Sequence, residues 1–186
     1  ALGLYNNISL FSFFLPHEKD YYGMLKICKN KKNLAIIDVG ANLGISTLGF
    51  RKLGFKNPIY LFEPNFFLYE NYLIKLKKKI NNLYIKNFAL GEKNSTNKFY
   101  LAFYKNKCLH FCSSFSKKYI KNTIKITFPK HKNKIYIKSE LIKSLRFDNL
   151  NIKHKPHFVK LDTEGFDYNI LKGFKKTIKK HQPIFL

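Results

Sequence analysis

The stretch of sequence that decides the fold is LAIIDVGANLG, residues 34–44. Its first six residues form a short apolar run, interrupted only by Asp38, which is typical of a strand buried on both faces of a parallel sheet. Glycines then allow a tight turn at Gly40 and Gly44, and a helix is expected from about Gly44 to Leu53. A buried strand, a glycine turn and a helix in this order predict the first unit of an α/β domain.

The remainder of the chain repeats this order of strand and helix. Helices are predicted at 65–79 and 166–180, and strands at 58–62, 83–88, 156–162 and from 183 to the end. Because strands joined by helices run parallel, we expect a mostly parallel central sheet with helices on both faces. The segment 91–155 departs from this order and is expected to be a β-rich insertion, with strands at 99–104, 124–128 and 135–137.

Length and composition favour one compact domain. The chain has 186 residues, 45% of them hydrophobic, which suffices for a single core. We divide it into an N-terminal segment, 1–32, whose helix from His17 to Asn30 packs on the core, and a main domain, 33–186. No apolar run approaches the ~20 residues of a membrane span, and Ile8 to Leu15 lacks the features of a signal peptide. Since the last strand is cut short, we expect the sheet to be truncated at its C-terminal strands.

The strongly basic balance raises the question of a nucleic-acid partner. The formal net charge is +24, from 35 Lys and Arg against 11 Asp and Glu, and residues 67–186 hold +20 of it. The surplus is scattered Lys with Arg146 as the only late Arg, whereas phosphate sites favour the planar fork of Arg. We interpret it as a coding bias that fills exposed positions, which leaves nucleic acid as an alternative partner that is not favoured.

The cysteines indicate the compartment. Three cysteines, an odd number, do not form a disulfide framework and favour a reducing, cytoplasmic environment. Cys108, His110 and Cys112 lie close together, but alternate residues of an extended segment supply at most three ligands with no second cluster. We therefore predict no metal site there.

Polar residues at the carboxyl ends of the predicted strands are the first candidates for a site, because ligands of open parallel sheets bind there. The turn 40–44 is not a dinucleotide fingerprint, since Asn42 and Ile45 occupy positions that would need glycine. Glu63 ends the next strand, where a carboxylate can accept hydrogen bonds from the ribose hydroxyls of a nucleoside. This combination suits S-adenosylmethionine, whose carboxylate could meet the N–H groups of the turn and whose cationic end could face Asp38.

Four motifs resemble, in order and spacing, the FkbM family of S-adenosylmethionine-dependent methyltransferases. They are DVGANLG at 38–44, FEP at 62–64, NFAL at 87–90 and VKLDTEGF at 159–166, so the resemblance runs from about residue 33 to the end. It implies a Rossmann-like class I methyltransferase fold and methylation of a hydroxyl oxygen on a sugar, glycolipid or secondary metabolite. It also implies the cofactor-binding residues: Gly40, Ala41, Asn42 and Gly44 for the methionine part, Glu63 for the ribose, Ala89 near the adenine, and in addition Pro64 and, from the pair Ser113-Ser114 in the insertion, Ser114.

The strand at 156–162 carries Lys160 in an otherwise apolar run, and a buried lysine must be paired. In an extended chain residues 160, 162 and 164 project to the same side, so Asp162 and Glu164 are its expected partners. We predict that Asp162 and Glu164 are the catalytic residues, which orient or deprotonate the acceptor hydroxyl. The alternative is that Glu164 and Asp167 only favour the start of the following helix.

Histidines are alternative general bases. His157 begins the strand at the opposite end of the sheet and His154 lies in the preceding loop, so neither is favoured. His110 and His131 belong to the insertion and stay open as candidates. A divalent cation held by paired carboxylates is a further, minority alternative.

The sequence thus predicts an S-adenosylmethionine-dependent O-methyltransferase. One alternative is an RNA methyltransferase that uses the basic surface and its interleaved Tyr and Phe side chains. The other is a non-catalytic basic binding domain on the same scaffold. Neither the oligomeric state nor the acceptor itself follows from the sequence, because a fold and its cofactor motifs do not determine the substrate.

Overall fold

The computed structural model of the chain describes residues 21–23 and 34–186. Residues 21–23 are helical, and the rest of the helix predicted from His17 to Asn30 lies outside the described residues, as does the remainder of the segment 1–32. Tyr21 is fully buried against the main domain, where its ring lies 4.6 Å from that of Phe50. This contact attaches the short helical piece to the core.

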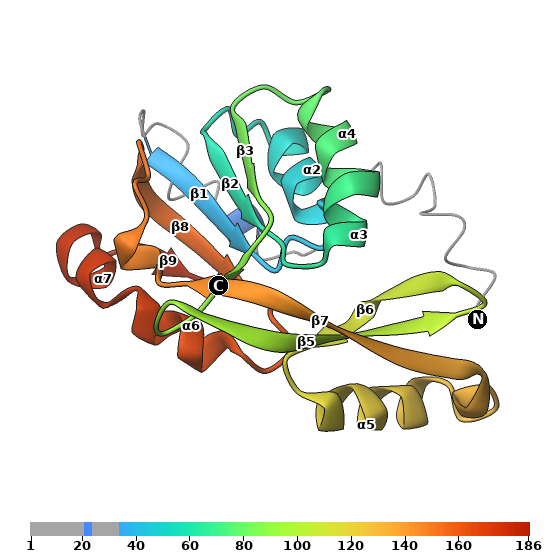
Figure 1. Cartoon of the computed structure of the whole chain (residues 1–186). Helices are drawn as coiled ribbons and strands as arrows, with labels where there is room; N and C mark the ends of the chain where they lie inside the picture. Colours follow the sequence, from blue (N-terminus) through green and yellow to red (C-terminus); the bar gives the residue numbers. More distant parts are fainter. Residues whose placement is uncertain (1–20, 24–33) are drawn as a thin grey trace.

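The centre of the molecule is a five-stranded parallel sheet in the order β3-β2-β1-β8-β9 (Figure 1). Its strands are β1 (Leu34–Val39), β2 (Ile59–Phe62), β3 (Leu83–Lys86), β8 (Lys155–Leu161) and β9 (Ile184–Phe185). The decisive stretch therefore forms the middle strand, and the predicted mixed α/β fold with a parallel sheet is confirmed. Because all these strands run the same way, their carboxyl ends meet at one edge.

Helices cover both faces of this sheet (Figure 1). One face carries α2 (Ile45–Lys52) and a helix that runs through α3 (Phe66–Leu68), a π-helical turn η3 (Tyr69–Leu73) and α4 (Ile74–Lys77); the other carries α6 (Asp167–Gly173) and α7 (Lys175–His181). Asn65 begins the helix predicted at 65–79, because its side chain accepts hydrogen bonds from the N–H groups of Phe67 and Leu68.

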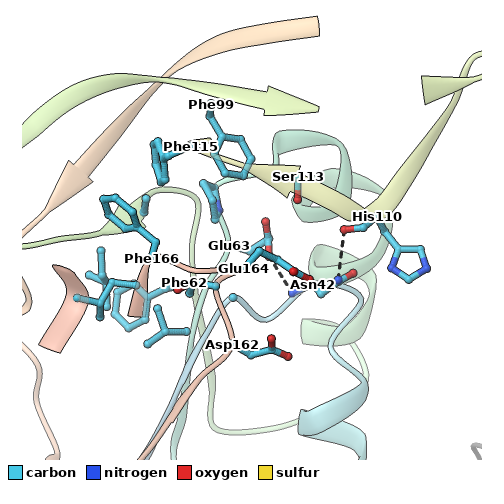
Figure 2. Close-up of a pocket in the computed structure, with 17 residues that line it drawn as sticks. Asn42, Phe62, Glu63, Phe99, His110, Ser113, Phe115, Asp162, Glu164 and Phe166 are labelled. Carbon is cyan, nitrogen blue, oxygen red and sulfur yellow. Dashed lines mark hydrogen bonds between the residues drawn. The ribbon is translucent and has the colours of Figure 1, made fainter. Parts of the chain in front are cut away.

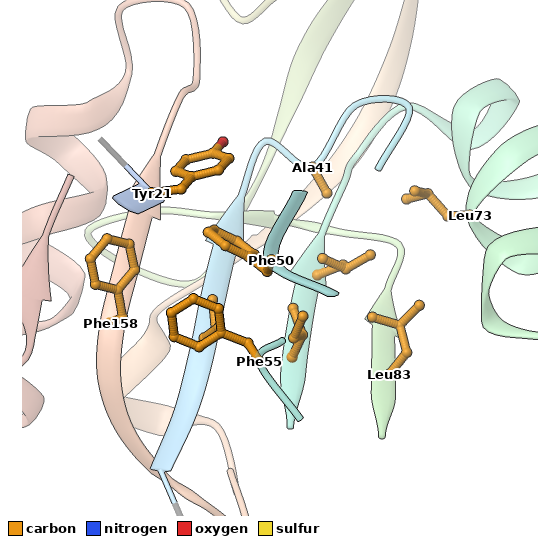
Figure 3. Close-up of a cluster of buried hydrophobic side chains, with 10 residues drawn as sticks. Tyr21, Ala41, Phe50, Phe55, Leu73, Leu83 and Phe158 are labelled. Atoms are coloured by element: carbon orange, nitrogen blue, oxygen red, sulfur yellow. The ribbon is translucent and has the colours of Figure 1, made fainter. Parts of the chain in front are cut away.

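Two apolar cores fill the space between the sheet and its helices. Alternate residues of β1 belong to each of them: Ile36 is in the core with Phe50 on one face, and Ile37 is in the core with Phe174 on the other. Figure 3 shows the cluster that contains Phe50. Both phenylalanines are fully buried, and such burial stabilises a fold by about 2–3 kcal/mol per side chain. The continuous apolar run of the strand is thus explained by burial on two faces.

The insertion, together with β4 just before it, forms a second sheet in the order β4-β7-β5-β6, in which β5 pairs antiparallel with both neighbours. Its elements are β4 (Ala89–Leu90), β5 (Ser95–Tyr104), β6 (Lys107–Ser114), α5 (Lys117–Thr127), β7 (Ile135–Leu145) and the short 3-10 helices η4 (Lys132–Lys134) and η5 (Phe147–Asn149). Helix α5 covers one face of this sheet (Figure 1). The strands predicted at 99–104 and 135–137 are present within β5 and β7.

The strand predicted at 124–128 is wrong, because these residues end helix α5. Ile120, Ile124 and Phe128 recur every fourth residue and are all buried against the sheet. That spacing places them on one face of a helix, whereas a strand would bury every second residue. The side chain of Ser116 caps the helix by accepting a hydrogen bond from the N–H of Tyr119.

Near its end, the insertion packs into the main core through Phe147. Its ring stacks on that of Phe174 with 3.9 Å between centroids, and the next residue, Asp148, accepts hydrogen bonds from the N–H groups of Lys176 and Thr177 at the start of α7. The insertion is therefore fixed to the helical layer where it ends. In the ranges 21–23 and 34–186, no helix has the length and apolar character needed to cross a membrane.

Candidate active site

A pocket lies at the carboxyl ends of β1, β2 and β8, beneath the insertion (Figure 2). The space it encloses is about 600 Å³, a volume that includes the part open to solvent. Its lining residues are Val39, Gly40, Asn42, Phe62, Glu63, Pro64, Ala89, Leu90, Phe99, His110, Ser113, Phe115, Asp162, Thr163, Glu164, Phe166 and Ile170. The main sheet and the insertion both contribute to this wall.

Glycine is required at the first position of the turn. Gly40 has a φ of +78°, and a Cβ atom there would lie 2.0 Å from the carbonyl oxygen of Asp162. The ends of β1 and β8 can approach this closely only without a side chain. Gly44 has a different role, because its Cβ would lie 2.6 Å from the Cδ2 atom of Leu76 and so would disturb the packing of the helices.

The amides of the turn already donate within the protein. The N–H groups of Gly40 and Ala41 donate to the carbonyl of Phe62, at 2.9 and 3.2 Å, and that of Gly44 donates to the carbonyl of Ala41 at 2.8 Å. The N–H of Asn42 donates to Oε2 of Glu63 at 2.8 Å. The sequence predicted that the N–H groups of the turn would meet an anionic ligand, but in the structure these four donate to Phe62, to Glu63 or to Ala41 of the turn itself.

Glu63 is a buried carboxylate at the centre of the pocket wall (Figure 2). Its two oxygens accept hydrogen bonds from the N–H groups of Asn42 and Asn65, each at 2.8 Å. Burial is the main reason why its pKa is raised from 4.5 to about 7, and the two amide donors only partly offset this. The carboxylate is thus poised to gain from further donors, since each oxygen can accept a second hydrogen bond.

Asn42 offers an acceptor beside Glu63. It has a φ of +51°, and its Nδ2 donates to the carbonyl of His110 at 3.3 Å (Figure 2). Its Oδ1 atom is buried, and within 21–23 and 34–186 no donor reaches it. A buried amide oxygen without a donor carries a desolvation cost that a ligand N–H group would relieve.

Lys160 lies between two carboxylates at the ends of β1 and β8. Its Nζ atom is 3.2 Å from Oδ2 of Asp162 and 3.7 Å from Oδ1 of Asp38. Although burial lowers the pKa of Lys160, the negative charges of Asp38 and Asp162 outweigh it and raise the pKa above its ordinary value. The predicted pairing of Lys160 with Asp162 is confirmed, and Asp38 is a further partner.

The predicted pairing of Lys160 with Glu164 is wrong. Strand β8 ends at Leu161, and Glu164 adopts a φ of +54°, so the alternation of an extended strand no longer applies. The hydroxyl of Tyr119, in helix α5, donates instead to Oε2 of Glu164. Asp167, the first residue of α6, accepts a hydrogen bond from the N–H of Thr163 at 3.1 Å.

Most of the predicted site residues lie around the pocket. Seven of them line it, namely Gly40, Asn42, Glu63, Pro64, Ala89, Asp162 and Glu164. Asp38 is fully buried beside Lys160 and is not a lining residue, and the same holds for Ala41 and Gly44. Ser114 is buried and accepts a hydrogen bond from the N–H of Ser116, while its neighbour Ser113 lines the pocket.

The aromatic side of the pocket was missed in the sequence. Phe99, Phe115 and Phe166 form a continuous wall, with 4.9 Å between the ring centroids of each successive pair (Figure 2). They come from three different elements of the chain, so no spacing in the sequence indicates that they meet. Only Phe99, which lies in a predicted strand, could have been proposed as an inward-facing residue.

The histidines and cysteines considered as bases or ligands have different surroundings. His110 alone among the histidines considered lines the pocket, and burial lowers its pKa. His154 shares a hydrogen bond of 2.8 Å with the hydroxyl of Tyr60 instead. Cys112 packs in the core of the insertion, and Sγ of Cys108 accepts a hydrogen bond from Asn65. No group of three His, Cys, Asp or Glu residues suited to a metal ion occurs in the described part of the chain.

Comparison with known proteins gave one finding. A family model described as the methyltransferase FkbM domain matches residues 38–186, which include the turn 40–44, Glu63 and the end of β8. No curated protein and no solved structure matched the chain.

Proposed function

The chain belongs to the FkbM methyltransferase family, and from this premise we propose that it transfers a methyl group from S-adenosylmethionine to a hydroxyl oxygen of a sugar, glycolipid or secondary metabolite. The observation that carries the proposal is the buried Glu63 carboxylate, which faces a pocket at the carboxyl ends of the parallel strands. This is the edge at which sheets of this kind bind nucleosides.

Glu63 would hold the ribose. Two ribose hydroxyls can donate to its two oxygens, which keep acceptor capacity beside the amides of Asn42 and Asn65. Such donors stabilise the ionised form, so binding would lower the raised pKa of Glu63 again. Affinity for the nucleoside is therefore expected to fall as the pH decreases below about 7.

The remainder of the cofactor would lie along the same wall. Oδ1 of Asn42 is an acceptor suited to the ammonium group of the methionine part. Ala89, Leu90 and Phe62 give an apolar surface for the adenine. Asp38 lies beneath the turn and would contribute its negative charge without direct contact, with Lys160 as its ion-pair partner.

S-adenosylmethionine, when bound, supplies a methyl group on a sulfonium as the electrophile. The residues of this chain would bring the acceptor hydroxyl into line and exclude water, which can supply much of the acceleration of a displacement. Asp162 is the proposed acceptor of the hydroxyl proton, because its side chain is 60% exposed at the pocket while Lys160 holds it from behind. Glu164 lines the same pocket and would orient the acceptor.

A transfer assay with S-adenosylmethionine labelled in its methyl group tests the proposal. We expect label to enter a hydroxyl-bearing acceptor from a panel of sugars, glycolipid precursors and RNA, and Asp162→Asn to reduce its turnover by roughly 10²-fold or more. Label that enters RNA alone would favour the RNA methyltransferase. Failure of the wild-type protein to bind S-adenosylmethionine would favour a non-catalytic binding domain.

A further inference from the structure

The loop that follows β8, residues 162–166, is connected to the insertion by side-chain contacts. The hydroxyl of Tyr119 donates to Oε2 of Glu164, and Oγ of Ser114 donates to the carbonyl oxygen of Glu164 at 3.4 Å. Next to this contact, the rings of Phe115, which follows Ser114, and Phe166, two residues after Glu164, lie 4.9 Å apart. Helix α5, the end of β6 and the residue after it thus contact this loop from the side of the insertion.

The backbone of the loop needs such support. Glu164 has a φ of +54° and Gly165 a φ of +88°, so two successive residues are left-handed. Glycine adopts this conformation readily, whereas a glutamate is disfavoured in it. A residue held in a disfavoured conformation requires its surroundings to fix it, and such positions often belong to functional sites.

The Tyr119 hydroxyl is suited to hold the carboxylate. Its hydrogen bond to Glu164 is the first cause that raises the pKa of Tyr119, so the hydroxyl keeps its proton and remains a donor across the neutral range. Tyr119 does not line the pocket, whereas Glu164 does. Tyr119 therefore acts on the pocket only through Glu164.

We propose that Tyr119 is a positioning residue whose hydroxyl holds the Glu164 carboxylate at the pocket, so that the insertion fixes the loop carrying Asp162 and Glu164. The proposal rests on the proposed function only in taking this pocket as the site of methyl transfer. The insertion then takes part in arranging the site as well as covering it.

Amide hydrogen exchange of the full chain without ligand is the first test. Tyr119→Phe removes only the hydroxyl, and we expect exchange at residues 163–166 to become roughly tenfold faster. Tyr136→Phe is the matched control, because Tyr136 is exposed to a similar degree, 39% against 37%, and its hydroxyl donates to Asn106 instead. The proposal is overturned if the loop exchanges equally fast in the wild type and Tyr119→Phe, or if both variants accelerate it alike.

Titration of the tyrosine rings, followed by NMR of ¹³C-labelled tyrosine, gives a signature that a merely structural role would not produce. The Tyr119 resonance, assigned by its loss in Tyr119→Phe, should titrate at lower pH in Glu164→Gln than in the wild type. The Tyr136 resonance should not move. An unchanged Tyr119 titration in Glu164→Gln would contradict the contact.

A pair of ligands then places Glu164 relative to the methyl donor. S-adenosylmethionine carries a positive sulfur, whereas S-adenosylhomocysteine carries a neutral one, so the former should shift the Tyr119 titration to lower pH than the latter. If Tyr119 titrates at the same pH with either ligand bound, Glu164 does not face the reacting sulfur. That result would overturn the proposal that Tyr119 positions Glu164 at the site of methyl transfer. If neither ligand binds, the proposed function fails, and the exchange experiment alone decides whether Tyr119 holds the loop.

Discussion

The central strands of the parallel sheet are buried on both faces, whereas the insertion sheet is buried unevenly, in β5 more than in β7. Val159 in β8 and Ile37 in β1 are inaccessible to solvent, but most of β7 is exposed, including Lys138 and Glu140. A sheet packed on two faces tolerates little change, because core substitutions leave cavities or strain. The exposed part of the insertion has fewer such constraints, so substitutions there should cost less stability.

Charges also differ between the two regions. The parallel sheet buries Asp38, Glu63 and Lys160 near its carboxyl edge. The insertion, 91–155, carries 16 Lys and Arg against 3 Asp and Glu, and its lysines lie on the surface. Buried charges depend strongly on their partners, whereas exposed ones are screened by solvent and salt. The charges that depend most on the fold therefore lie in the parallel sheet, although the insertion holds +13 of the net charge of +24.

The largest effect is expected at the turn of the parallel sheet. Gly40→Ala should destabilise the protein by about 4 kcal/mol or more, because the added Cβ would overlap the carbonyl oxygen of Asp162 and the residue has a positive φ. Gly54→Ala is the control, since its φ is +87° but no atom lies within 4 Å of the added Cβ; about 1–2 kcal/mol is expected. Urea unfolding measures both, and equal losses would refute the close approach of β1 and β8.

Glu63 should make stability depend on pH in an unusual direction. Its pKa is about 7 in the folded protein against 4.5 for an unperturbed carboxyl, so the folded state holds the proton over this window. Stability from this group is present below pH 4.5 and is lost as the pH rises through about 7. The difference amounts to about 3 kcal/mol, which Glu63→Gln should remove. The free energy of unfolding is measured for both proteins from pH 4 to 8. The same dependence on pH in the wild type and Glu63→Gln would contradict the raised pKa of Glu63.

Asp148 joins the two regions, and Asp148→Ala should cost about 2 kcal/mol because the start of α7 loses its cap. Its hydrogen bonds outweigh burial and lower the pKa of Asp148, so this stabilisation is present at neutral pH and is lost in acid. Glu92→Ala is the control, because its ion pair with Lys172 is exposed, and less than about 0.5 kcal/mol is expected. Thermal unfolding that showed equal losses would argue against the cap.

The smallest effects test the helix of the insertion. Ile124→Val should cost about 1 kcal/mol, and Ile126→Val almost nothing, because Ile124 is buried and Ile126 is 80% exposed. In a strand the two side chains would share a face, and the two losses would be alike. Comparable destabilisation in urea would therefore restore the strand that the sequence predicted at 124–128.

The sequence was most informative where burial is simplest. The apolar runs that became β1 and β8, and the polar residues at their ends, were predictable because a strand buried on both faces has few alternatives. The secondary structure of the insertion was harder to predict, because the spacing of apolar residues in its Lys-rich segments fits both a helix and a strand. Ile124 and Ile126 gave the appearance of alternation, and the spacing of Ile120, Ile124 and Phe128 was the better guide.

The site was predictable residue by residue only along regular backbone. Alternation pairs Lys160 with Asp162, but it fails at Glu164 because β8 has ended and the chain has turned left-handed. Ser113 and Ser114 could not be distinguished without knowing which face of β6 meets the pocket. The contact of Tyr119 with Glu164 joins residues 45 positions apart and left no pattern in the sequence.

The most direct test of the central claim, that Glu63 holds the ribose of S-adenosylmethionine, is a calorimetric titration with this compound at pH 8. The wild-type protein should bind it, and Glu63→Gln should bind it at least roughly tenfold more weakly, while the exposed control Glu92→Gln binds as the wild type does. Wild-type protein that binds no S-adenosylmethionine, or Glu63→Gln that binds it with undiminished affinity, would contradict the claim.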